Sequence, residues 1–411
     1  MVAGRARAPR DRRRGDDPRR RDHVAAGRDL TVDLAELRTL RLRVQGLRAP
    51  FDASGPEVVR RFAAVQAQEF LPAQWGLAAR VPHDRRPDAA TLAAALDDGG
   101  ILRTHVLRPT WHFLHPDDAR WIMEVSAERV YGASRTYIRR SGLEGETGTR
   151  GLAIVAASLE GGHRTRAELT AALEAGGLPL TGLAFTYVLM LAELERVAIS
   201  GANAGKQRTY AAFDERVPPS APRPREEALA ELAARFIASR GPVTERDFAA
   251  WSGFTLGDAR RAFADAADPE GLGGGRIEEL EVDGAAHVLD AATVASLEPA
   301  EPVSDAAAPV VDLLQAYDEY IMGYAPPRSY LQPPGRSDPV HPEFPLHALV
   351  IDGTMAGRWA PVVEAKRARV RIVPWREFTP AEERALAASV AEVERFLGQP
   401  VTVEREPIPS A

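Results

Sequence analysis

Residues 151–177 read GLAIVAASLEGGHRTRAELTAALEAGG, and this stretch decides the fold of the chain. Apolar residues recur at helical spacing from Gly151 to Leu159. The segment Thr165 to Glu168 (TRAE) is a capping box, in which each of the two end residues binds a backbone N–H group of the other. It therefore predicts the start of a second helix, which ends at the glycine pair 176–177.

A third helix is expected at about 181–196, followed by two short strands at 197–200 and 207–213. The glycine-rich turn between the strands leads into Lys206 and Arg208. Helices followed by a two-stranded hairpin are typical of a winged helix-turn-helix unit.

The same order of elements occurs in two other places. The later copy is predicted from helices at 225–240, 244–251 and 256–266 and from a hairpin at 277–289 that turns at Asp283-Gly284. The earlier copy is predicted from helices at about 33–46, 56–69 and 88–97, with strands at 101–107 and 110–114. Beyond residue 299, four short strands and a closing helix at 380–397 indicate a small β-rich domain.

We therefore predict an α+β protein with three tandem winged-helix units and a β-rich C-terminal domain. The predicted divisions are an Arg-rich disordered tail (1–30), winged helices at 31–117, 118–222 and 223–303, and the C-terminal domain at 304–411.

Composition excludes several classes of function. With 411 residues and 45% hydrophobic content, the chain is long enough for two to four domains. No apolar run reaches the roughly 18 residues that span a bilayer, and no export signal is recognisable, so a cytoplasmic protein without membrane contact is expected. The sequence has no cysteine and no paired metal-ligand spacing among its nine histidines, so we expect no metal and no cofactor.

The net charge of −6 has to be reconciled with nucleic-acid binding. The first 30 residues carry ten Arg and five Asp, so the rest of the chain carries −11. A DNA-binding body of this charge must concentrate its cations locally, because affinity depends on the phosphates actually neutralised. The candidate cations include Arg103, His105, Arg108, Lys206 and Arg208.

The tripeptide Gln66-Ala67-Gln68 lies four residues before Pro72. In a regular helix two side chains at positions i and i+2 point about 200° apart and cannot serve one site. Because a proline disfavours helical backbone at the preceding residue, we expect the helix to end near residues 68–70, which lets the two amides converge. Repeated winged helices leave two classes open, a transcription regulator and an enzyme that acts on DNA.

Three motifs resemble those of the AlkZ/YcaQ superfamily of winged-helix DNA glycosylases, in the expected order over about residues 31–375. They are QAQE at 66–69, LRPTWHF at 107–113 and DEYIMGY at 318–324. The resemblance implies excision of N-alkylated purines from double-stranded DNA, in several relatives with unhooking of interstrand crosslinks. Gln68, where the YcaQ-like branch has Asp, implies the AlkZ-like branch. That resemblance suggests self-resistance to a genotoxin, and general alkylation repair remains the alternative.

The resemblance also assigns roles to residues. Gln66 and Gln68 become the candidate catalytic pair, which places water and stabilises positive charge on the sugar. With no catalytic Lys nominated, a monofunctional enzyme is expected, acting as a monomer that associates with the nucleoid when bound to DNA. On the second strand of the first hairpin we expect Trp111 to be in the core and His112 to face DNA. Tyr320 and Tyr324 are either a core pair or DNA contacts, and we include them among the predicted contacts. The competing interpretation is a winged-helix DNA-binding regulator without catalytic activity.

Overall fold

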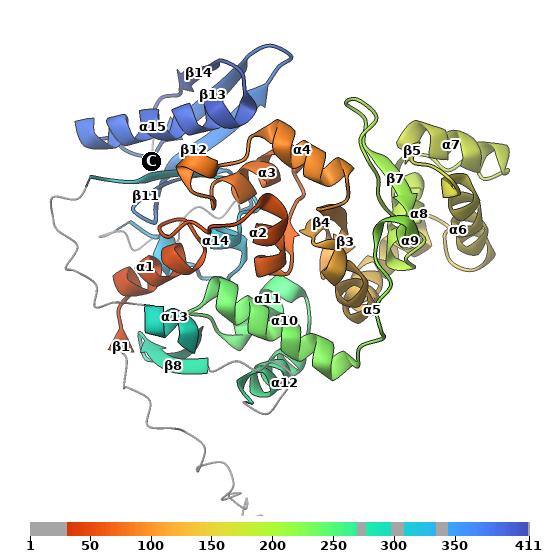
Figure 1. Cartoon of the computed structure of the whole chain (residues 1–411), viewed down its shortest axis with the longest axis horizontal. Coiled ribbons are helices and arrows are strands. Elements are labelled where there is room, and N and C mark those ends of the chain that lie inside the picture. Colours follow the sequence, from red (N-terminus) through yellow and green to blue (C-terminus); the bar gives the residue numbers. More distant parts are fainter. Residues whose placement is uncertain (1–30, 269–276, 297–307, 334–343, 410–411) are drawn as a thin grey trace, which may run out of the picture.

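The computed structural model describes residues 31–268, 277–296, 308–333 and 344–409, in which helices alternate with four small sheets (Figure 1). The α+β class is confirmed. The predicted disordered tail lies outside the described residues. None of the described helices combines the length and the apolar character that crossing a bilayer requires.

The first segment lies at the centre of the molecule (Figure 1). Capping boxes at Asp33 and Ser54 begin its first two helices. In each, the capping side chain accepts a hydrogen bond from the backbone N–H three residues later, and the glutamate side chain at that later position accepts one from the backbone N–H of the capping residue. In chain order its elements are α1 (Leu34–Val44), α2 (Gly55–Phe62), β2 (Val65–Gln66), α3 (Phe70–Ala78), α4 (Ala89–Asp97), β3 (Leu102–Val106) and β4 (Arg108–Leu114).

The predicted helix at 56–69 begins as expected but is too long. Helix α2 ends at Phe62, and the chain then turns sharply at Ala63, which has φ 61° and ψ −48°, while Ala64 N–H donates to Phe62 O at 2.7 Å. This is a γ-turn with a strained central residue. Pro72 lies in the first turn of α3, where its missing N–H would have no helical partner in any case. The proline therefore opens a helix instead of ending one.

The second segment occupies one side of the molecule (Figure 1) and has a hydrophobic core of its own. The predicted capping box is confirmed: Thr165 N–H donates to Glu168 Oε2 at 2.7 Å, and Glu168 N–H donates to Thr165 Oγ1 at 3.3 Å. Its elements are α5 (Pro116–Arg140), α6 (Glu146–Leu159), β5 (Arg164–Thr165), α7 (Arg166–Ala175), α8 (Gly182–Leu194), β6 (Ala198–Ser200), β7 (Thr209–Ala212) and α9 (Phe213–Arg216).

The third segment repeats helices followed by a hairpin, and its hairpin turns at Asp283-Gly284 as predicted. A two-residue strand near the start of the chain, β1 (Thr31–Val32), pairs in parallel with the first strand of this hairpin. The elements are α10 (Arg225–Arg240), α11 (Glu245–Ser252), α12 (Leu256–Ala267), β8 (Ile277–Val282), β9 (Ala285–Asp290) and α13 (Ala291–Ser296).

The C-terminal segment forms one five-stranded sheet in the order β10-β11-β12-β13-β14, with α15 packed against it (Figure 1). The last strand, which the sequence did not predict, pairs in parallel with β13. The elements are β10 (Val311–Leu314), α14 (Glu319–Met322), β11 (Ala348–Ile351), β12 (Thr354–Val363), β13 (Ala368–Pro374), α15 (Pro380–Leu397) and β14 (Val401–Arg405).

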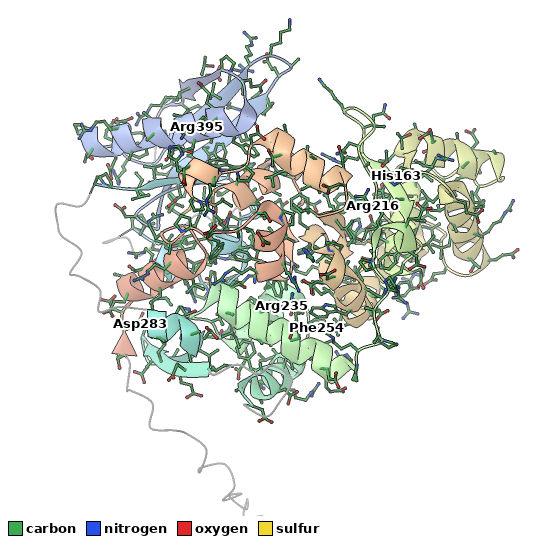
Figure 2. All side chains as sticks on the ribbon, viewed as in Figure 1. His163, Arg216, Arg235, Phe254, Asp283 and Arg395 are labelled. Atoms are coloured by element: carbon green, nitrogen blue, oxygen red, sulfur yellow. The ribbon has the colours of Figure 1, made fainter. Side chains whose placement is uncertain are left out.

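Arginine side chains join the segments, and two of them, Arg216 and Arg235, are labelled in Figure 2. Arg216 donates to the carbonyl oxygens of Leu96 and Asp97 at 2.6 and 2.9 Å, and so caps the end of α4 from the second segment. Arg235 of α10 donates to Asp118 Oδ2 at 2.6 Å. Two hydrophobic cores are each built from more than one segment, so the first, third and C-terminal segments pack as neighbours around the first hairpin.

Candidate active site

The sheet β2-β4-β3 carries most of the predicted site. Its antiparallel register pairs Gln66 with His112 and pairs His112 with Thr104. Side chains alternate between the two faces of a strand, so these three residues share one face, while Trp111 and its cross-strand partner His105 share the other. The hairpin thus divides the predicted site residues between two environments.

Gln66 is buried, with 2% of its surface exposed. Its backbone N–H points away from β4 and donates to Glu319 Oε1 at 2.9 Å, and its carbonyl oxygen accepts from Gln315 Nε2 at 3.3 Å. Its side-chain oxygen accepts from Arg108 Nη2 at 2.6 Å. A guanidinium only donates, so this contact fixes which end of the carboxamide faces Arg108.

Gln68 is partly exposed. Its side-chain oxygen accepts from Trp111 N–H at 3.2 Å, and its backbone oxygen accepts from Arg103 Nη2 at 3.3 Å. Both amide oxygens of the Gln pair are therefore bound by residues of β4. The expected helix end is absent from this segment: it runs out of a two-residue strand, since Ala67 N–H continues the ladder to Trp111 O at 2.7 Å.

Arg108, predicted to contact DNA, is half-buried and bound to Gln66. Burial lowers its pKa from the ordinary 12.5, and the neighbouring Glu319 raises it. Arg108 therefore orients the side-chain amide of Gln66, the candidate catalytic residue.

A buried ion pair between Arg240 and Glu319 supports residues 66–68, here called the Gln segment. The sequence analysis did not predict this pair. Arg240, at the end of α10, binds Glu319 Oε2 at 2.7 Å and also donates to Phe62 O and Ala64 O at 3.2 and 3.0 Å. It thereby clamps both sides of the γ-turn at Ala63. Trp251 Nε1 adds a bond to Glu319 Oε2 at 3.1 Å. The only available signal was the second position of the quoted motif DEYIMGY, which is Glu319.

His112 is fully buried, so the expected exposure of the strand is reversed: Trp111 is the partly exposed residue. The His112 Nδ1 atom lies 3.0 Å from Thr110 O. Burial, followed by the charge of Arg108, holds the pKa of His112 well below 6.5, so the ring is neutral at physiological pH. The side chain lies in the interior, where the charge of Arg240 of α10 also lowers its pKa.

On the other face, a hollow of about 280 Å³ lies between the first and second segments. Arg103 is nearly buried there, lies 4.3 Å from the centre of the Trp111 ring, and donates from Nε to Ala67 O at 3.0 Å. Burial and then the charge of Arg208 lower the pKa of Arg103 to about 10, so it remains a cation. The lining residues include Phe70, Arg103, Trp111, Arg166, Glu193, Arg208 and Tyr210.

His105 is buried at this junction and does not reach the surface. Its Nδ1 atom contacts Glu193 Oε2, and its backbone N–H donates to the same oxygen at 3.1 Å. This pair ties β3 to α8, so His105 joins two segments.

Lys206 and Arg208 lie on the turn between β6 and β7 and are exposed. Arg208 stacks over the Phe70 ring at 4.3 Å, which brings the turn of the second segment close to the Gln segment of the first. Of the predicted DNA contacts, these two cations are the ones open to solvent.

Tyr320 and Tyr324 are core residues, and their inclusion among the DNA contacts is wrong. Both are buried, and their hydroxyls donate to Gly353 O at 3.0 Å and to Arg240 O at 2.7 Å. The i, i+4 spacing that allowed a surface role instead directs both rings under α1, where Arg41 lies 3.8 Å from the centre of the Tyr324 ring. Within the described part of the chain, no three His, Asp or Glu side chains are grouped to hold a metal ion.

Comparison with known proteins gives the family. A family model described as DNA glycosylase AlkZ-like matches residues 59–396. Among solved structures, the Streptomyces sahachiroi DNA glycosylase AlkZ is similar, with 21% sequence identity, a TM-score of 0.68, and coverage of 92% of this chain and 100% of that chain. No curated protein matched. The likeness to the solved structure shows the fold, and the family model covers well over half of the sequence. The chain therefore belongs to the AlkZ-like family of DNA glycosylases.

Proposed function

We propose that this protein is a monofunctional DNA glycosylase that hydrolyses the N-glycosidic bond of N-alkylated purines in double-stranded DNA. The observation that supports this most directly is the anchoring of both carboxamides of Gln66 and Gln68 on strand β4, in a chain of the AlkZ-like family. We take the three helix-and-hairpin segments to be tandem winged helices. The competing interpretation, a transcription regulator without catalytic activity, does not account for a match to a family of DNA glycosylases.

The substrate itself reduces what the enzyme must supply. A purine alkylated at N7 or N3 is cationic, so its bond to the sugar is weakened and the base departs without a strong general acid. The remaining tasks are to hold water and to stabilise positive charge on the sugar, which oriented amide dipoles do. Each side-chain oxygen of the Gln pair accepts one bond from β4 and keeps one lone pair for water.

The two glutamines have different parts in this proposal. Gln68 is partly exposed and meets the lesion and its water directly. Gln66 lies deeper, and Arg108 polarises its carbonyl while Glu319 holds its backbone. Lys206 and Arg208 contact DNA phosphate from the second segment.

The test is incubation of the purified protein with duplex DNA that contains N7-methylguanine, followed by alkaline cleavage of abasic sites. We expect strand cleavage only after alkali, because the chain has two lysines in all, Lys206 and Lys366, and neither belongs to the Gln segment. Gln66→Ala and Gln68→Ala should each lose most base release. Absence of base release from every N-alkylpurine tested would refute the proposal.

Crosslink unhooking and self-resistance are separable parts of the proposal. Duplexes joined by an interstrand N-alkylpurine crosslink should be resolved into single strands by the parent protein and not by Gln68→Ala. Deletion of the gene should increase the sensitivity of the host to the crosslinking agent. Unchanged sensitivity would remove the self-resistance role and leave the glycosylase proposal standing.

A further inference from the structure

Unpaired polar atoms gather on the inner face of the sheet β2-β4-β3. His112 Nε2, Thr104 Oγ1, Thr110 Oγ1 and Arg108 Nε are all buried and have no hydrogen-bond partner among the described residues. These are four of the ten such side-chain atoms in the described part of the chain, and they come from two adjacent strands. Buried polar groups in proteins are nearly always hydrogen-bonded, so a concentration of this kind points to a polar occupant.

The chemistry of the ring defines what His112 needs. Thr110 O can only accept, so His112 Nδ1 carries the ring proton, and the neutral ring presents a lone pair at Nε2. The neighbouring cations Arg108 and Arg240 both disfavour a second proton. The group that satisfies Nε2 must therefore donate, and the two threonine hydroxyls can accept from it or donate to it.

Gln66 supplies the link from this face to the candidate active site. It is the direct cross-strand neighbour of His112 in β2, and Ala67 forms the adjacent ladder bond, so the Gln66–His112 pair is the closely spaced, non-hydrogen-bonded kind. Arg108 occupies Gln66 Oε1, so the Nε2 end of the carboxamide is left to donate elsewhere. A donor on Gln66 and an unpaired acceptor on His112 thus belong to directly paired residues of neighbouring strands.

We propose that this face binds internal water that bridges Gln66 Nε2 and His112 Nε2, and that His112 is a positioning residue which fixes the Gln66 carboxamide from behind. Water fits both groups, because it accepts from the amide and donates to the ring. Thr104 and Thr110 complete its coordination. The proposal rests on the proposed function only for its effect on base release, because the water site itself does not require activity.

A high-resolution crystal structure of the wild-type protein tests the site directly. We expect ordered density at about 2.7–3.2 Å from His112 Nε2, within reach of Gln66 Nε2 and Thr104 Oγ1. A dry face would overturn the proposal whether or not the enzyme releases base. If the water is present and the wild-type protein acts on no lesion, the proposed function fails and the water site stands.

Thr104→Val gives a thermodynamic test. In a dry site it removes an unpaired buried hydroxyl and raises the Tm, whereas in a hydrated site the hydroxyl has a partner and the Tm does not rise. Thr209→Val is the matched control, because the Thr209 hydroxyl already donates to Ala202 O, and its Tm should fall in either case. A higher Tm for Thr104→Val contradicts internal water.

The kinetic test compares two replacements of His112. His112→Gln keeps an acceptor, whereas His112→Phe keeps only volume. For the loss of one hydrogen bond we expect kcat to fall about tenfold in His112→Phe, with less loss in His112→Gln and with KM unchanged in both. Equal kcat in the two variants, or an effect confined to KM, would exclude a positioning role through a hydrogen bond.

Discussion

Arg108 Nη2 donates to Gln66 Oε1 at 2.6 Å, between two residues that are 42 positions apart in the sequence. The contact is short, charge-assisted and half-buried, so it is stronger than a neutral hydrogen bond. It withdraws electron density from the amide oxygen and fixes its direction. A cation that sequence reasoning assigned to DNA is thus bound to the candidate catalytic side chain.

Arg108→Ala should lower kcat for base release by about 10- to 100-fold, because a hydrogen bond to a charged group contributes about 1.5–3 kcal/mol and 1.4 kcal/mol is tenfold in rate. Arg108→Lys should restore only part of this, since an ammonium lacks the planar fork. Single-turnover base release at saturating enzyme measures the change. Arg384→Ala, an exposed cation on α15, is the control and should be silent. A pure loss of DNA affinity in Arg108→Ala would return this residue to the DNA-contacting set.

Glu319→Gln should destabilise the protein strongly, because it leaves Arg240 charged, fully buried and without its carboxylate. Breaking a buried pair costs about 3–5 kcal/mol of unfolding free energy. Urea unfolding measures it. Glu383→Gln, which breaks an exposed pair with Arg405, should cost less than about 1 kcal/mol. Similar costs for the two variants would mean that the buried pair does not support the γ-turn and the Gln segment.

Acid should weaken the fold through His112. The pKa of His112 in the folded protein lies below the ordinary 6.5. Below pH 6.5 the His112 ring is therefore protonated in the unfolded chain while it is still neutral in the folded protein. The contribution of His112 to the free energy of unfolding is therefore fully present above pH 6.5. It decreases as the pH falls, by at most about 1.4 kcal/mol per pH unit. Other histidines with lowered pKa contribute in the same direction, namely His115, His163 and His287.

The contribution of His112 is isolated by difference. Urea unfolding of wild type and His112→Gln at pH 7.5 and pH 5.5 should show a smaller loss on acidification in the variant. The carboxylates with lowered pKa titrate at more acidic pH and do not interfere in this window. Parallel losses in the two proteins would mean that the His112 ring is protonated in the folded state.

Arg208→Ala should weaken binding to undamaged duplex DNA. It should also reduce the slope of log affinity against log salt concentration by about 1, the amount expected for one lost phosphate contact. Arg208 is exposed and stacks on Phe70, so its removal leaves no buried charge unpaired. Fluorescence titration at several salt concentrations measures both quantities. An unchanged salt slope would place the DNA path away from the β6–β7 turn.

Local chemistry made much of the secondary structure predictable. The capping box at Thr165, the start of a helix at Thr244 and the turn at Asp283-Gly284 appear where the sequence indicates them, because each is completed within a few residues. The closing helix 380–397 was predicted with its observed ends for the same reason. Pro72 was misread because proline suits both the end of one helix and the first turn of the next.

The sequence by itself determined the α+β class, the order of helices and hairpins, the family motifs, and the alternation that puts Trp111 and His112 on opposite faces of β4. Only the tertiary structure decided which of those faces is buried, because the His112 face is closed off in the interior, whereas the Trp111 face borders the hollow between the first and second segments. It also decided that Glu319, 253 residues from Gln66, holds the Gln segment in place. Periodicity follows from backbone geometry within one strand, whereas burial and pairing depend on contacts between residues that are distant in the chain.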